Sequence, residues 1–137
     1  MTQENEDVFQ TMVAGKISDI RKAVAEIEQE IQQRESIDSE VLVEIQKEIM
    51  EVRNRMLEVE QFSGSVQSSH PFPRIDTLER EVVSLEGQKR FEKVSCWRDL
   101  TSLRKEIRFY MKELNDLLRK IKLVQNDVSS RGFTEEA

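Results

Sequence analysis

The chain has 137 residues, of which 35% are charged and 37% hydrophobic, with four glycines, two prolines and a net charge of −6. Few turn-forming residues and a periodic apolar pattern are typical of long helices and argue against disorder. A single cysteine, Cys96, excludes an internal disulfide, and no apolar run approaches the about 18 residues of a transmembrane helix.

The charge is unevenly distributed between the two halves of the chain. Residues 1–62 carry 15 acidic and 7 basic side chains, whereas residues 63–137 carry 12 acidic and 14 basic ones. This difference favours antiparallel packing of one half on the other, within one chain or between two. Residues 1–7 are acidic and lack the apolar stretch of a signal peptide, so we expect a cytoplasmic protein with no membrane contact.

The first predicted helix covers residues 6–35. Its apolar residues follow the 3,4 spacing of a coiled-coil seam, that is, heptad positions a and d. The pattern breaks at residues 36–39, where Asp38 suits the N-cap of a second helix that reaches residue 62. We therefore predict an N-terminal αα-hairpin over residues 1–62. The seam of the first helix contains Val13, Ile17, Ile20, Val24, Ile27 and Ile31.

The second predicted helix has two apolar lines. Its seam runs from Leu42 to Val59, and a second line of Val43, Met50 and Leu57 recurs every seven residues on a flank. A helix with two apolar lines contacts more than one neighbour. This helix therefore lies in a bundle of three or more helices, or its flank offers a groove to an outside helix.

Residues 63–73 form the only clear loop in the sequence. Serine and glycine loosen this segment, and Pro71 and Pro73 hold the residues before them extended. Phe72, between the two prolines, either closes the loop onto the helices or anchors a short docking motif.

Residues 74–130 form a long helical element that begins near Asp76. The 3,4 spacing holds as far as Leu85 and then fails, because Lys89 and Glu92 stand where apolar residues are due. Two alternatives fit: one helix over residues 76–129, or a break near residues 87–95. After the break in pattern, Phe91, Val94 and Trp97 are expected to take over on a shifted face, with Trp97 in the core. Residues 131–137 are predicted to be a flexible tail.

The strongest periodic pattern lies in this element, and it predicts a seam that needs other helices to bury it. Two further residues, Phe109 and Leu123, lie two heptads apart on an outer flank and are candidates for a second interface. The seam residues are Leu100, Leu103, Ile107, Tyr110, Leu114, Leu117, Ile121 and Val124.

A basic stripe follows the solvent-facing side of the same helix. Phosphate binding needs several cations on one face, but acidic residues alternate with these, so nucleic acid is the weaker interpretation. The stripe consists of Lys105, Arg108, Lys112, Arg119 and Lys122.

No catalytic, metal-binding or cofactor-binding motif is present. His70 is the only histidine and Cys96 the only cysteine, and the four glycines form no phosphate-binding loop. The sequence thus predicts an all-α antiparallel helical bundle or coiled coil with an N-terminal αα-hairpin and a long C-terminal helix. The expected function is that of a non-enzymatic scaffold or adaptor subunit that binds protein or itself, with a nucleic-acid-associated or regulatory protein as the alternative.

Overall fold

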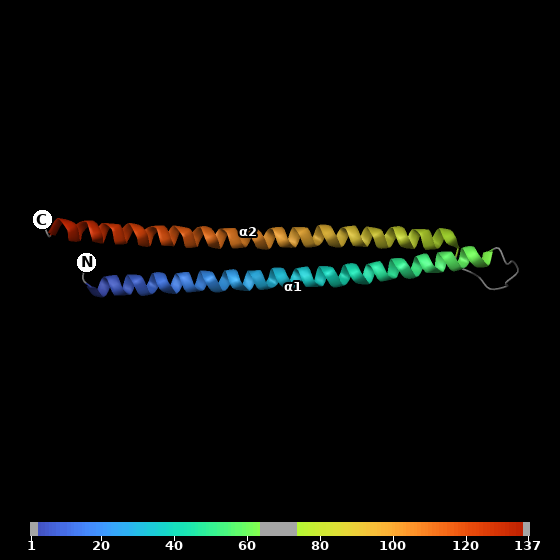
Figure 1. The fold of residues 1–137 in the computed structure, drawn as a ribbon, viewed down its shortest axis with the longest axis horizontal. Helices are drawn as coiled ribbons and strands as arrows, with labels where there is room; N and C mark the ends of the chain where they lie inside the picture. The colour runs from blue at the N-terminus through green and yellow to red at the C-terminus, as the bar shows by residue number, and fades with distance from the viewer. Residues whose placement is uncertain (1–2, 64–73, 136–137) are drawn as a thin grey trace. The chain divides into compact units, whose positions relative to one another are not determined.

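The structure, a computed structural model, consists of two long helices (Figure 1). Helix α1 spans Gln3–Ser63 and helix α2 spans Ile75–Glu135. The backbone is described for residues 3–63 and 74–135, and side-chain burial for residues 3–61 and 74–127. Within these ranges the chain contains no strand. The predicted all-α class is therefore confirmed.

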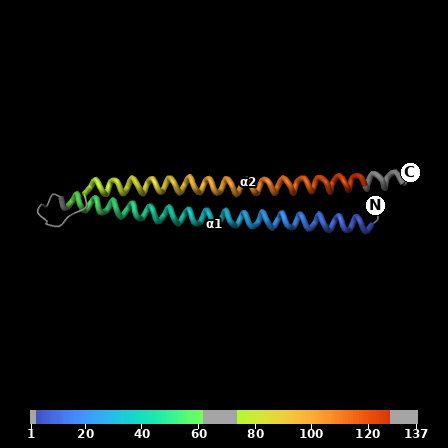
Figure 2. Tube along the Cα trace, turned by 180° about the vertical axis from the view of Figure 1, so that it is seen from behind, coloured from blue at the N-terminus to red at the C-terminus, as the bar shows by residue number. Residues whose placement is uncertain are grey.

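The segments of α1 and α2 that contact each other run antiparallel. Arg34 of α1 contacts Glu92 of α2, whereas Arg53, further along α1, contacts Glu86, which is earlier in α2. Within each of the two units described next, both views show the α1 and α2 segments side by side with their directions opposed (Figures 1 and 2). The predicted antiparallel packing of helices is thus present within one chain.

Contacts between the helices divide the chain into two units. The terminal unit joins Met1–Ile31 with Thr101–Ala137, and the hairpin unit is Gln32–Leu100. Apart from Cys96, the buried apolar residues of both units are seam positions that the 3,4 spacing predicts. The buried apolar residues of the terminal unit are Val13, Ile20, Ile27 and Leu114. The core of the hairpin unit consists of Ile45, Ile49, Val52, Leu78 and Leu85, with Val41, Met56, Val59 and Val82 packed against it.

The predicted N-terminal αα-hairpin is wrong, because α1 continues through residues 36–39 without a break. Serine, isoleucine and aspartate each cost a helix only about half a kcal/mol relative to alanine, and neither proline nor glycine interrupts this segment. Asp38 is therefore an interior helical residue that is partly buried, not an N-cap. Its environment is described below.

Helix α2 is also continuous, so the one-helix alternative is correct and no break occurs near residues 87–95. Its seam does not shift to a new face: Lys89 and Glu92 stay partly buried, and Cys96 is 6% exposed. The expected core position of Trp97 is wrong. The three apolar residues predicted to take over are all exposed, namely Phe91 at 74%, Val94 at 52% and Trp97 at 65%.

The ends of α2 differ from the prediction by different amounts. The helix begins at Ile75, where the amides of Thr77 and Leu78 donate to the carbonyl of Arg74, one residue from the expected start. At the other end α2 extends to Glu135, so the predicted flexible tail is helical up to that residue. Gly132 does not end the helix, because glycine tolerates helical dihedrals at a cost of about 1 kcal/mol. The predicted Ser-Gly-Pro loop lies outside the described residues, apart from Ser63 in α1.

Candidate functional site

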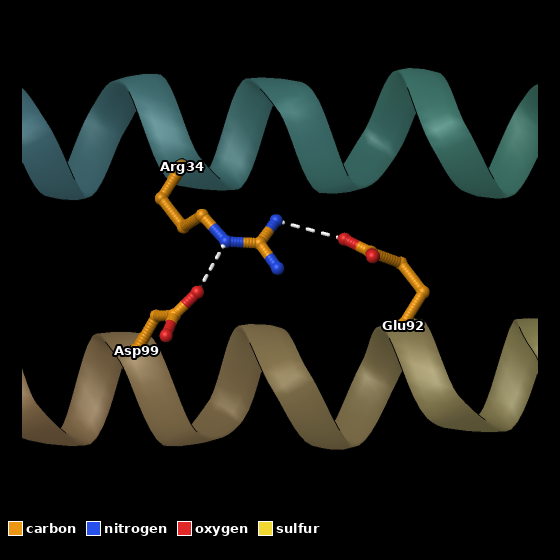
Figure 3. A network of polar contacts seen from close by, with 3 residues as sticks. All are labelled: Arg34, Glu92 and Asp99. Carbon is orange, nitrogen blue, oxygen red and sulfur yellow. Dashed lines mark hydrogen bonds and ion pairs between the residues drawn. The ribbon is translucent and has the colours of Figure 1, made fainter.

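A polar layer interrupts the apolar seam of the hairpin unit (Figure 3). Arg34 Nη1 donates to Glu92 Oε1 at 2.8 Å, and Arg34 Nε donates to Asp99 Oδ2 at 2.9 Å. The side chains of Arg34 and Glu92 are each 17% exposed, whereas that of Asp99 is 54% exposed. The hydrogen bonds to Asp99 and then to Glu92 raise the pKa of Arg34 above its ordinary value. One guanidinium therefore ties α1 to two turns of α2.

Cys96 and Asp38 belong to the same part of the seam. Burial raises the pKa of the Cys96 thiol, and the negative charge of Asp38 raises it further, while Arg34 acts in the opposite direction. Asp38 Oδ1 is buried and has no hydrogen-bond partner among the described residues. Cys96 is thus a buried cysteine whose environment favours the protonated thiol, which is a poor nucleophile.

We expect iodoacetamide to modify Cys96 at least about tenfold more slowly in the folded chain than in the chain unfolded by guanidinium at the same pH. Burial limits access, and the raised pKa lowers the thiolate fraction. The rate of Cys96 modification should also begin to rise at a higher pH in the folded chain than in the unfolded chain. Mass spectrometry of timed samples measures both rates, and equal rates in the two states would contradict the buried position.

Two further polar contacts join the helices beside the core of the hairpin unit. Lys89 Nζ donates to Gln46 Oε1 at 3.2 Å, and Arg53 Nη2 lies 3.3 Å from Glu86 Oε1. The side chains of Arg53 and Glu86 are 52% and 44% exposed, so this ion pair adds little to stability. These contacts mark the flank of the hairpin unit on which α1 and α2 approach each other.

The chemistry of the polar layer fits a contact that sets the register of two helices. Polar groups within an apolar seam satisfy each other in only one alignment and so select it, often at some cost in stability. Arg34 already neutralises the carboxylates nearest to it. Over residues 3–63 and 74–135, no group of three His, Cys, Asp or Glu side chains is placed to hold a metal ion.

The predicted interaction seam of α2 packs against α1 of the same chain in the terminal unit. Leu117 lines two surface grooves there, one with Ile20 and one with Val13. Leu114 is 8% exposed and Val124 is 37% exposed. The other seam residues are partly buried: Leu100 in the hairpin unit, and Leu103, Ile107, Tyr110, Leu117 and Ile121 in the terminal unit.

Phe109 and Leu123, the candidates for a second interface, are 61% and 62% exposed. The ring of Phe109 makes an edge contact with Tyr110, with centroids 5.9 Å apart and an interplanar angle of 73°. Tyr110 is itself partly buried, so the contact holds Phe109 at the border of the seam. Their role in binding remains a prediction.

The five residues of the basic stripe, Lys105, Arg108, Lys112, Arg119 and Lys122, are all exposed. Exposed acidic residues on the same helix, including Glu106, Glu113 and Asp116, reduce the positive field. Nucleic-acid binding therefore stays a prediction that this surface does not strengthen.

The polar layer is the feature that sequence reasoning missed. Its signal was present in the spacing, since Arg34 and Asp38 continue the 3,4 pattern from Ile31, and Glu92 and Cys96 continue it from Leu85 through Lys89. Polar residues at seam positions on both helices are the pattern of a paired layer. When each helix is considered alone, the same polar residues suggest that its apolar seam ends there.

Comparison with known proteins places the chain in a family. No curated protein and no solved structure matches it significantly. In the described part of the chain, neither helix is long and apolar enough to cross a membrane. The family that matches is described as a family of unknown function (DUF8104), and the match covers residues 6–126. The chain therefore belongs to the family of unknown function DUF8104.

Proposed function

We propose that this chain is a non-enzymatic scaffold or adaptor subunit that acts by helix–helix association with protein, including further copies of itself. A helix pair has room for one buried stripe, so apolar residues on other faces are available to a partner. The observations that support the proposal are the amount of surface and the kind of residue exposed on it.

The amount of exposed apolar surface is the observation that carries the proposal. Among the residues whose burial is described, sixteen large hydrophobic side chains are at least 37% exposed. Soluble monomers seldom leave large apolar patches uncovered, so a chain of this kind gains stability when other helices cover part of its surface.

The exposed apolar residues lie on both helices and in both units. In the terminal unit, Met111 and Leu118 are 41% and 44% exposed, one heptad apart beside the seam of α2. In the hairpin unit, Met50 and Trp97 are 50% and 65% exposed. Heptad-spaced apolar residues beside a filled seam are typical of helices that contact a second neighbour.

We expect the purified chain to have the mass of two or more copies in multi-angle light scattering. Its melting temperature should rise as the protein concentration increases from about 1 to 100 μM, because association stabilises the folded state by mass action. Circular dichroism at each concentration measures the melting temperature. A single-chain mass together with a melting temperature that does not depend on concentration would refute self-assembly.

A further inference from the structure

An apolar line on α1 of the hairpin unit has no cover. Val43, Met50 and Leu57 are 54%, 50% and 56% exposed. They alternate with Gln46 and Arg53, which contact α2. Residues three or four apart share a helix face, so the line lies just outside this contact flank. We call these three residues the outer line.

We propose that the outer line is a self-association surface on which a second copy of this chain packs α1 against α1, antiparallel, with Met50 on the two-fold axis. The inference rests on the proposed function and deepens it by naming the surface and the partner. Two features of the hairpin unit support it: the spacing of the outer line and the charges beside it.

The spacing of the outer line makes it self-complementary. Because the three residues are seven apart, a two-fold axis at Met50 places Val43 of each copy opposite Leu57 of the other. An interface of this symmetry uses the same patch on both copies, so the patch must match its own inverse. Two rows of three large apolar side chains, centred on flexible methionines, meet this condition.

The residues that flank the outer line are compatible with this alignment and disfavour the two alignments that are shifted by one heptad. With Met50 on the axis, Lys47 faces Asn54 of the other copy, and Arg53 faces Gln46. A shift of one heptad in one direction sets Lys47 opposite Lys47, and a shift in the other direction sets Arg53 opposite Arg53. Like charges in contact are unfavourable, so the charges select one register.

Glu44 and Glu48 point to other directions around α1, whereas Glu51 borders the groove that Val43 and Met50 line. Glu40 and Glu60 lie three residues from the two ends of the outer line, and the alignment centred on Met50 sets them opposite Gln61 and Ser39 of the other copy rather than opposite a like charge.

Variants that each add one cysteine to the chain test the proposed register through disulfide formation, which requires Cα atoms within about 7 Å. Under mild oxidation, we expect Met50→Cys to form a covalent dimer by itself. Val43→Cys and Leu57→Cys should not do so alone, since their own copies lie about 20 Å apart along the helix. An equal mixture of these two variants should form a covalent heterodimer. Non-reducing gel electrophoresis measures each product.

Two controls accompany these variants. Glu48→Cys is exposed and lies two residues from Met50, about 200° round the helix, so it should give no covalent dimer. The wild type, whose only cysteine is the buried Cys96, reports the background. In addition, Met50→Glu should weaken self-association at least about tenfold, because two carboxylates then face each other on the axis. Phe91→Glu, at another exposed apolar position of the hairpin unit, should leave it unchanged.

The possible outcomes separate this inference from the proposed function. Covalent dimers from Val43→Cys alone and Leu57→Cys alone would mean parallel packing and would overturn the antiparallel register. A dimeric mass with no cross-link from any outer-line variant would overturn the surface and leave the proposed function standing. A single-chain mass for the wild type would overturn both self-assembly and this surface.

Discussion

Substituting aspartate for Leu114 is expected to unfold the terminal unit rather than only separate one chain from another. Leu114 is 8% exposed and, over the part of α2 whose burial is described, is the one buried apolar residue of that unit. The change removes a buried leucine and places a carboxylate in an apolar site without a partner, at a cost of about 4 kcal/mol. A small domain has a total stability of about 5–15 kcal/mol, so this is a large fraction. Hydrogen exchange measured by mass spectrometry should show faster exchange in residues 3–31 and 101–127.

The matched control is Leu123→Asp, the same substitution on the same helix at a residue that is 62% exposed. It should change the free energy of unfolding by less than about 0.5 kcal/mol and leave exchange unaltered. If Leu114→Asp kept normal exchange in both segments and altered only the mass in solution, the α2 seam would join two chains. That result would contradict the packing of α2 on α1 within one chain.

The apolar seam could be predicted from the sequence because a strict 3,4 spacing has only one burial solution. Ile20, Ile27 and Leu114 are named from the spacing alone and are buried in the structure. A 3.5-residue period fits both parallel and antiparallel packing, and it does not identify the helix against which each helix packs. The charge difference between the two halves indicates antiparallel packing, which is present within each unit.

The continuity of α1 through residues 36–39 could not be predicted, and that of α2 could not be decided between two alternatives, because both depend on contacts distant in the sequence. Arg34 and Asp38 look like the end of a seam when α1 is read alone, and Glu92 looks like a failure of register when α2 is read alone. Arg34 is separated from its partners by 58 and 65 residues. Two apparent breaks are therefore one layer, which becomes visible only when the helices are paired.

The position of Trp97 shows a second limit of reading one helix at a time. Adjacent residues in a helix point about 100° apart, so the assignment of Cys96 to the seam turns Trp97 outward. A sequence reading that prefers the larger apolar residue for the core selects Trp97 and is wrong, since Cys96 is 6% exposed and Trp97 is 65% exposed. Once Lys89 and Glu92 are accepted as seam residues, the 3,4 spacing assigns Cys96, not Trp97, to the same face.

The second large effect is expected from the polar layer. Arg34→Met should lower the free energy of unfolding by about 2 kcal/mol, between the 3–5 kcal/mol of a broken buried ion pair and the at most about 1 kcal/mol of an exposed one. The intermediate value follows from the exposure of the partners, which is 17% for Glu92 and 54% for Asp99. The loss arises because Glu92 remains in the seam without a counter-charge. Urea unfolding followed by circular dichroism measures it.

Two companion variants separate charge from register. Arg34→Lys keeps the charge but cannot reach Glu92 and Asp99 with one planar fork, so we expect it to lose about half of the effect. The double change Arg34→Met with Glu92→Leu should recover most of the stability, since an apolar pair replaces the ion pair. If the polar layer sets the register, this double variant will be stable but will pair its helices in more than one alignment, with broadened exchange kinetics in residues 32–61 and 74–100. A double variant as unstable as Arg34→Met would contradict that role, because an apolar pair should then restore the lost stability. A double variant whose helices pair in one alignment would also contradict it, because the apolar pair would then select the register as well as the ion pair does.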